Sequence, residues 1–137
     1  MALPTGSAYR NPVPLKPGLT AAVEHVVTDA DTAEAMRSGS VPVLATPRLI
    51  ALCEEASVAA LDGVLAPGQT SVGTKVQIDH LAATAVGQSV RAEASVEKVN
   101  GRRIIFTVSV NDARGLVAVG RVTRVVVDVE RFLDRTR

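Results

Sequence analysis

Four consecutive runs of alternating apolar and polar residues fill the second half of the chain and constrain its fold more than any other feature. They cover residues 71–81, 89–99, 102–111 and 116–129. Alternation with a period of two is typical of strands that bury one face. Asn100-Gly101 favours a tight type I′ hairpin turn after the second run, and Asp-Ala-Arg-Gly at 112–115 predicts a slightly longer hairpin turn after the third. The last three runs are therefore expected to form an antiparallel meander.

One amphipathic helix precedes these runs. Thr46-Pro47 is a helix start signal, with the hydroxyl of Thr46 as the cap and Pro47 at the first helical position. Asp62-Gly63 ends the helix. Over residues 48–61 the apolar stripe consists of Leu49, Leu52, Cys53, Ala56 and Ala60. Before the helix, residues 19–27 predict a further strand and residues 28–45 a loop or short weak helix, which is a candidate lid.

One strand, one long helix and four more strands, mostly antiparallel, predict an α+β domain. Five strands can bury a single helix only by curling round it, and this arrangement is the hot dog fold. Such a sheet leaves long edges, which pairing with a second copy buries, so we expect a homodimer that could pair further into a tetramer. The domain is expected at 19–130, between an extended, proline-rich N-terminal arm at 1–18 and a C-terminal tail at 131–137.

Composition excludes several classes of function. The 137 residues fit one domain, and the formal net charge of +1 does not suggest a nucleic-acid partner. No apolar run approaches the roughly 18 residues that a membrane span needs. The single cysteine, Cys53, rules out an internal disulfide and predicts a cytoplasmic protein. No cluster of Cys and His suggests a metal site, and no cofactor is expected.

His80 is the histidine whose surroundings look arranged for chemistry. Period-two alternation puts it on the apolar face of its run, with Val72, Thr74, Val76 and Ile78. A buried imidazole needs a partner, and helical phase points to Glu54 rather than Glu55, because Glu54 has the more apolar neighbours. We therefore expect a His80–Glu54 pair with Thr46 as a third member. A satisfied core or interface histidine at 80, a solvated Glu54 and a purely capping Thr46 stay open as alternatives.

Helix geometry restricts this constellation. In an unbroken helix from Thr46, eight residues at about 1.5 Å each separate Thr46 from Glu54 by roughly 12 Å along the axis, too far for a hydrogen bond. We therefore expect regular helix to begin at or after Pro47, with the chain doubling back before it.

Several stretches carry a resemblance to a known family. They are Ala45-Thr46, Cys53-Glu54-Glu55-Ala56, Ser71-Val72-Gly73-Thr74, Asp79-His80-Leu81-Ala82-Ala83-Thr84 and Gly87. Over about residues 40–130 their order resembles the hot dog fold thioesterases, and among these the fluoroacetyl-CoA thioesterase-like branch. The resemblance implies catalytic roles for Thr46, Glu54 and His80, a backbone N–H of Gly73 near the thioester, and Arg124 near the active site. That family's lid carries phenylalanines, whereas residues 29–45 contain none, so an acyl group other than fluoroacetyl is expected.

The expected activity is hydrolysis of a small or medium acyl-CoA. Glu54 would act as a general base on water or attack directly to give a mixed anhydride, His80 would orient the carboxylate and shuttle a proton, and Thr46 would position water or substrate or act as the nucleophile. The alternatives are a non-catalytic acyl-CoA-binding module on the same fold and a hydratase or dehydratase, whose usual helix motifs are missing.

Basic residues around Asn100-Gly101 form a second candidate region. Lys98, Arg102 and Arg103 could contact the phosphates of CoA, although a charged hairpin tip is more often only solvated. His25 is expected to be a surface or interface residue, and Cys53 a small buried hydrophobic residue rather than a nucleophile.

Overall fold

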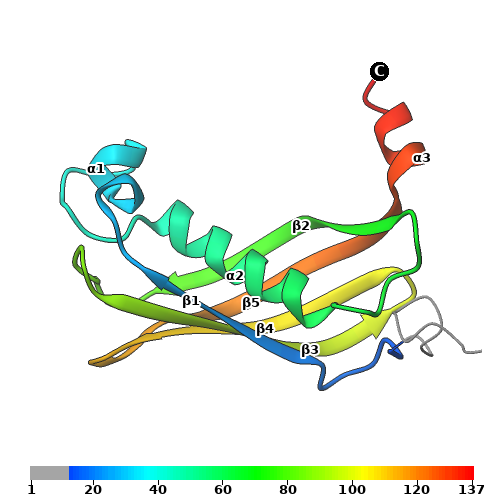
Figure 1. The fold of residues 1–137 in the computed structure, drawn as a ribbon, viewed down its shortest axis with the longest axis horizontal. Coiled ribbons are helices and arrows are strands. Elements are labelled where there is room, and N and C mark those ends of the chain that lie inside the picture. Colours follow the sequence, from blue (N-terminus) through cyan, green and yellow to red (C-terminus); the bar gives the residue numbers. More distant parts are fainter. Residues whose placement is uncertain (1–12) are drawn as a thin grey trace, which may run out of the picture.

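A single antiparallel sheet dominates the computed structural model, which describes residues 13–137. Its strands lie in the spatial order β1-β3-β4-β5-β2, so that β1 and β2 form the two edges (Figure 1). Every predicted strand is confirmed to within two residues at each end, and β3, β4 and β5 form the predicted meander. The strands are β1 (Thr20–Val26), β2 (Gln69–His80), β3 (Ser89–Asn100), β4 (Arg103–Asp112) and β5 (Gly115–Asp128).

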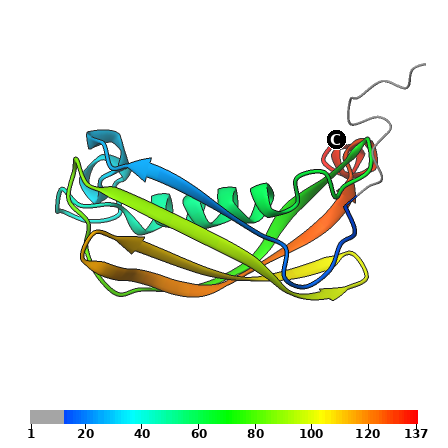
Figure 2. The ribbon, with the colours of Figure 1, turned by 60° about the horizontal axis from the view of Figure 1, so that its bottom comes forward.

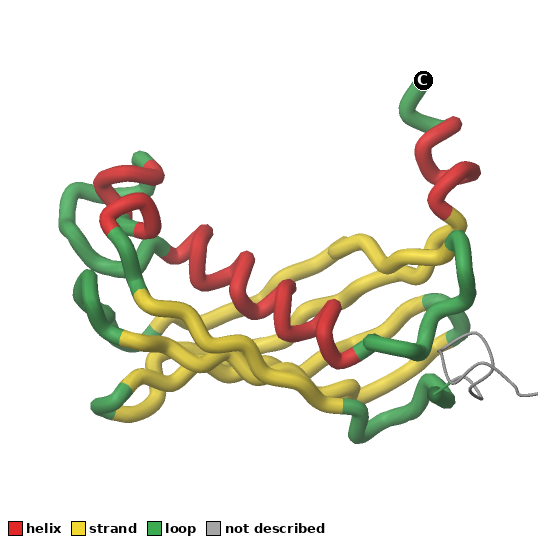
Figure 3. The backbone as a smooth tube through the Cα atoms, viewed as in Figure 1, coloured by secondary structure: helices red, strands yellow, loops and turns green. Residues whose placement is uncertain are grey.

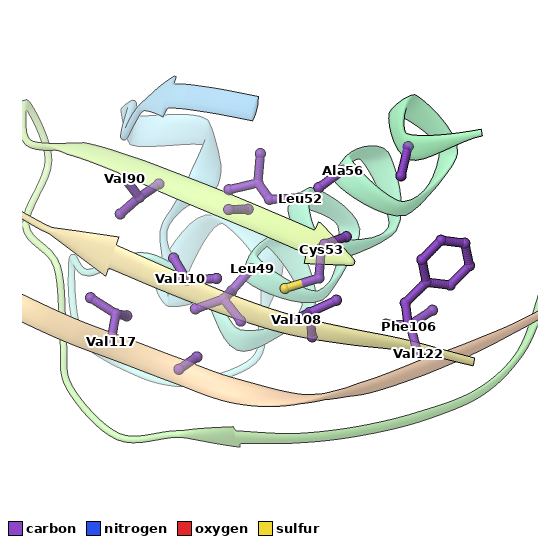
Figure 4. Packing of buried hydrophobic residues seen from close by; sticks show 14 of the residues in the cluster. Leu49, Leu52, Cys53, Ala56, Val90, Phe106, Val108, Val110, Val117 and Val122 are labelled. Carbon is purple, nitrogen blue, oxygen red and sulfur yellow. The ribbon is translucent and has the colours of Figure 1, made fainter. Parts of the chain in front are cut away.

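The sheet curls round the long helix α2 (Thr46–Ala60), which lies in its concave face (Figure 2). All five residues of the predicted apolar stripe are buried. They form one cluster with inward-facing residues of the sheet, including Val90, Val108 and Val110 (Figure 4), and α2 contacts β1, β3, β4 and β5. One helix wrapped by five strands confirms the hot dog architecture.

Three shorter helices complete the described part of the chain (Figure 3). The lid segment contains the 3-10 helix η2 (Asp29–Asp31) and helix α1 (Ala33–Met36), and the C-terminal end forms helix α3 (Val129–Asp134) where a frayed tail was expected. The Asp128 side chain caps α3 by accepting from the N–H of Arg131. The predicted N-terminal arm lies largely outside the described residues. No described helix has the length and apolar character needed to span a membrane.

The start of α2 differs from the prediction by one residue. Ala45 is the N-cap, so Thr46 and Pro47 occupy the first and second helical positions in a helix that runs unbroken to Ala60. Pro47 is still tolerated because the N–H groups of the first turn have no partner inside the helix. The expectation that regular helix begins at or after Pro47 is wrong, and so is the capping role of Thr46, whose hydroxyl has a different partner.

The β3–β4 hairpin also differs in detail. Asn100 pairs with Arg103, so the central turn residues are Gly101 and Arg102, and of these only Gly101 has a positive φ, of 59°. A type I′ turn needs positive φ at both central residues, whereas type II′ needs it only at the first and favours glycine there. The predicted hairpin is confirmed, but its turn type is not I′.

A β-bulge in β2 changes which residues face the helix. Gly73 pairs with Arg124 of β5 and Lys75 pairs with Thr123, so Thr74 is the extra residue. Beyond the bulge, Val76, Ile78 and His80 share the inward face, as predicted. Before it, Ser71 and Gly73 face inward in place of Val72. A bulge re-aims a strand in this way, and without it Gly73 and His80 would lie on opposite faces.

Candidate active site

Thr46 and His80 form a direct hydrogen bond at the lid end of α2. Thr46 is the first residue of α2, and His80 is the last residue of β2. The Thr46 Oγ1 to His80 Nδ1 distance is 2.7 Å, and the tautomer of the ring decides which atom donates. The hydroxyl makes no cap hydrogen bond to the helix backbone. The Thr46 hydroxyl therefore bonds to His80 and is not the helix cap that the sequence pattern suggests.

The environment of His80 favours the neutral ring. Burial lowers the pKa of His80 below its ordinary value of 6.5, and the backbone of Ala82 partly offsets this effect. The second ring nitrogen, Nε2, is buried and has no hydrogen-bond partner within residues 13–137. A buried polar atom without a partner costs about 1–3 kcal/mol. Such an atom indicates a partner that the single chain does not supply.

Glu54 is held by Arg124. Nη1 of Arg124, on β5, donates to Glu54 Oε2 over 2.9 Å. The Arg124 side chain is 8% exposed, and its other donors bond to Ser71, with Nε on the hydroxyl and Nη2 on the carbonyl, each at 2.8 Å. Glu54 is 35% exposed, whereas Glu55 is an exposed residue, so the predicted choice of Glu54 as the more inward carboxylate is confirmed. Arg124 is buried and bonds through all three of its nitrogens, so it can hold the Glu54 carboxylate in one orientation.

Gly73 allows this carboxylate to lie against β2. A Cβ atom at position 73 would collide with Oε2 of Glu54 and would also approach Nη1 of Arg124 to 3.5 Å. Glycine allows this close approach, because a side chain at position 73 would push the Glu54 carboxylate aside, and the φ angle of Gly73 does not require glycine. Gly73 and Arg124 are direct cross-strand partners and therefore share one face of the sheet.

The two pairs lie apart within one chain. Eight helical residues separate Thr46 from Glu54, or roughly 12 Å along the axis. On the sheet, His80 pairs with Ala118 and Gly73 pairs with Arg124, so six residues of β5, or about 20 Å, separate these positions. The expected His80–Glu54 contact is therefore absent within one chain. Helical phase identified the correct face of α2 but said nothing about position along its axis.

An open groove runs beside Glu54. It has a volume of about 430 Å³ and is lined by residues that include Ala51, Val58 and Ala59 together with Glu54 and Arg124. Val58 is 51% exposed, although it is apolar. The exposed side of α2 thus offers small aliphatic side chains next to a held carboxylate. Among the described residues, no group of three His, Cys, Asp or Glu side chains could hold a metal ion.

The other sequence candidates lie elsewhere. Lys98 pairs with Ile105 and Arg103 with Val125, on the outer face of the sheet away from α2, and Arg102 donates to the carbonyl of Val126 over 3.4 Å. No salt bridge to these three basic residues is found in the part of the chain that the structure describes. Their contact with phosphates stays a prediction.

Cys53 and His25 have clear structural roles. Burial, together with the charge of the neighbouring Glu54, raises the pKa of the Cys53 thiol to about 12, which confirms a buried residue and excludes a ready nucleophile. His25 is not a free surface residue, because its Nε2 lies 2.7 Å from Oδ2 of Asp31. Asp31 and Ser71 were missed as functional candidates because nothing in the local pattern marks either one.

Comparison with known proteins identifies the family of the chain. The family model for the fluoroacetyl-CoA-specific thioesterase matches residues 27–130. The fluoroacetyl-CoA thioesterase of Streptantibioticus cattleyicolor is 36% identical over 95 residues, which cover 69% of this chain and 68% of that protein.

Solved structures extend the likeness to the fold. A structure of the fluoroacetyl-CoA thioesterase superposes with a TM-score of 0.85 at 29% identity and covers 90% of this chain and 96% of its own. A thioesterase superfamily member from Thermus thermophilus gives a TM-score of 0.83 at 31% identity and covers 89% of this chain and 90% of its own. The chain belongs to the fluoroacetyl-CoA-specific thioesterase family.

Proposed function

We propose that this protein hydrolyses the thioester bond of a small or medium acyl-CoA. The observation that carries the proposal is the Thr46–His80 hydrogen bond, which lies on the same helix and the same sheet face as a carboxylate held by Arg124. A related fluoroacetyl-CoA thioesterase variant has been solved with acetyl-CoA bound, which supports an acyl-CoA ligand. Because residues 29–45 contain no aromatic side chain, we propose that the acyl group of the substrate is one other than fluoroacetyl.

We further propose that the working site forms between two copies of the chain. Strand β2 is an edge strand, and no other described strand pairs with its outer side, so antiparallel pairing with a second copy can take place there. If Gln77 pairs with Gln77 of the second copy, Val76 lies opposite Ile78, and with Thr74 as the extra residue the same pairing sets His80 opposite Gly73 of that copy. Glu54 of the second copy, which lies against Gly73, would then approach the unpartnered Nε2 of His80. A homodimer of this kind joins the two pairs that one chain keeps apart.

The chemistry needs a nucleophile, proton control and stabilisation of charge on the carbonyl oxygen. In one route Glu54 removes a proton from water, the water oxygen attacks the carbonyl carbon, and the C–S bond breaks to release CoA thiolate. In the other route Glu54 attacks directly and water hydrolyses the resulting anhydride. In both routes neutral His80 can relay a proton, and Thr46 positions His80 through Nδ1.

A panel of acyl-CoAs of increasing chain length, with a thiol reagent that reports free CoA, tests the activity. We expect turnover by the wild type, its loss in Glu54→Ala and His80→Ala, and its retention in the matched control Glu55→Ala. If acyl-CoA binds but no member of the panel is hydrolysed, the protein is a non-catalytic binding module instead. Full activity in Glu54→Ala would refute the assigned carboxylate.

A further inference from the structure

Asp31 is the most heavily hydrogen-bonded carboxylate in the lid segment. Its side chain is 8% exposed and accepts from four donors. These are the Thr28 N–H at 2.7 Å, the Thr28 hydroxyl at 2.9 Å, His25 Nε2 at 2.7 Å and Arg48 Nε at 3.0 Å. Burial alone would raise the pKa of Asp31, but these hydrogen bonds hold it well below its ordinary value of 3.8. The group is therefore a buried, ionised anchor.

The four donors come from three separate parts of the fold. His25 lies on β1, Thr28 precedes η2, and Arg48 lies in the first turn of α2. The backbone adds a further link, because the carbonyl of Asp31 accepts from the N–H of Ala45 over 2.8 Å. Residues 45 and 48 lie on either side of Thr46 in sequence. Asp31 thus holds the helix start both before and after the residue that bonds to His80.

The helix start is also held by the packing of the buried residues Leu44, Ala45 and Leu49 and by backbone hydrogen bonds. Leu44 donates its N–H to the carbonyl of Thr84 over 2.9 Å, and residues 32 and 44 form an isolated bridge. Thr46 itself is exposed and makes no cap hydrogen bond. Its direction toward His80 therefore depends on how the first turn of α2 is seated. Hydrogen bonds that involve a charged partner are about twice as strong as neutral ones.

We propose that Asp31 is a positioning residue for hydrolysis, which clamps the first turn of α2 to the lid and to β1 so that the Thr46 hydroxyl meets His80. The inference rests on the proposed thioesterase function for its kinetic consequence. Its structural part stands on the contacts of Asp31 alone. Arg48 is the partner through which the charge of Asp31 acts on the helix.

Two variants test the clamp by independent routes. Asp31→Asn keeps the size of the side chain but removes its charge, and Arg48→Gln removes the link to α2 while leaving Thr28 and His25 in place. Because misplacement of about 1 Å can cost up to a hundredfold in rate, we expect kcat to fall about tenfold or more in both variants, with KM changed less than about twofold. The control is Glu24→Gln, next to His25 on β1, which breaks an exposed ion pair with Arg91 of β3 and should match the wild type.

Amide hydrogen exchange supplies a readout that does not depend on turnover. In both variants exchange should rise in residues 43–49 and stay at the wild-type level in residues 104–110 of β4. An unchanged kcat, or a rise in exchange that is equal in the two segments, would show a merely structural role and overturn the proposal. If the wild type hydrolyses no acyl-CoA, the proposed thioesterase function is refuted. The hydrogen-exchange comparison then still shows whether Asp31 holds the first turn of α2 in place.

Discussion

Subunit complementation tests whether the active site draws on two copies. One chain carries Thr46→Ala and the other Glu54→Ala, each with its own affinity tag, and tandem purification isolates the mixed dimer. Within one chain the Thr46–His80 pair and the Glu54–Arg124 pair are separated by roughly 12 Å along α2. A site confined to one chain cannot be repaired by mixing, because each chain then lacks one of its own members.

The expected magnitude follows from two-fold symmetry. In the mixed dimer one site combines both defects, whereas the other takes an intact Thr46 from one chain and an intact Glu54 from its partner. One site of two is therefore restored, and the mixed dimer should have about half the wild-type activity per dimer. Both parent homodimers should be inactive.

The assay is release of CoA from the best acyl-CoA of the panel, with the concentration of tandem-purified dimer measured independently. A mixed dimer of Thr46→Ala and His80→Ala is the matched control. Both of these changes affect the same half of the site, so this dimer should stay inactive. A Thr46→Ala and Glu54→Ala dimer as inactive as its parents, or a wild type active as a monomer, would refute the two-copy site.

Four further predictions concern single residues. Gly73→Ala puts a Cβ atom against the Glu54 carboxylate, so kcat should fall about tenfold or more while the circular dichroism spectrum is retained; full activity would contradict the contact. Because burial lowers the pKa of His80 and a Glu54 carboxylate beside Nε2 would raise it, the NMR titration midpoint of His80 should be higher in the wild type than in Glu54→Gln, and equal midpoints would contradict the His80–Glu54 contact between copies. Because burial raises the pKa of Cys53 to about 12, the native protein should not react with a thiol reagent, whereas the denatured chain should release one equivalent, with early reaction as the contrary result. The pKa of Asp31 is lower in the folded than in the unfolded protein, so its ionisation stabilises the fold above pH 3.8. This contribution is lost as the pH falls below that value. The urea midpoints at pH 5 and pH 3 should therefore differ more for the wild type than for Asp31→Asn, and equal differences would contradict the role of Asp31.

Much of the fold could be predicted from local pattern. The apolar stripe of α2 and the alternation in β3 and β4 are periodic over ten or more residues, and their buried faces agree with the structure. Burial on one face dominates the energetics of such elements, so periodicity alone identifies them. The β3–β4 hairpin could also be predicted, because Asn100-Gly101 between two alternating runs is typical of a tight hairpin turn.

The rest depended on contacts between distant residues. Thr46 looks like a cap because local capping chemistry fits it, but the hydroxyl bonds to His80, 34 residues away in sequence. The bulge at Thr74 breaks the period of two, and the adjacent Gly73 is a local sign of it, because an isolated glycine within a strand often marks a bulge. Asp31 lies in a segment without periodicity, where its partners on β1 and α2 become neighbours only after folding.

Neither the Thr46–His80 pair nor the Glu54–Arg124 pair forms a complete active site by itself. The bulge at Thr74, the unpartnered Nε2 of His80 and the contacts of Asp31 all bear on how two copies of the chain would combine these pairs. The extra residue in β2 lets Gly73 and His80 face the same side, so a single strand pairing with its own copy can bring both pairs together. An unpaired Nε2 of His80 costs about 1–3 kcal/mol in the separate chain, and a carboxylate from a second copy would remove this cost. On the proposed assembly, the contact that completes the catalytic group therefore also favours dimer formation. Replacement of His80 or Glu54 should then abolish activity and also weaken the dimer, whereas replacement of Asp31 should lower the rate and leave the dimer dissociation constant unchanged.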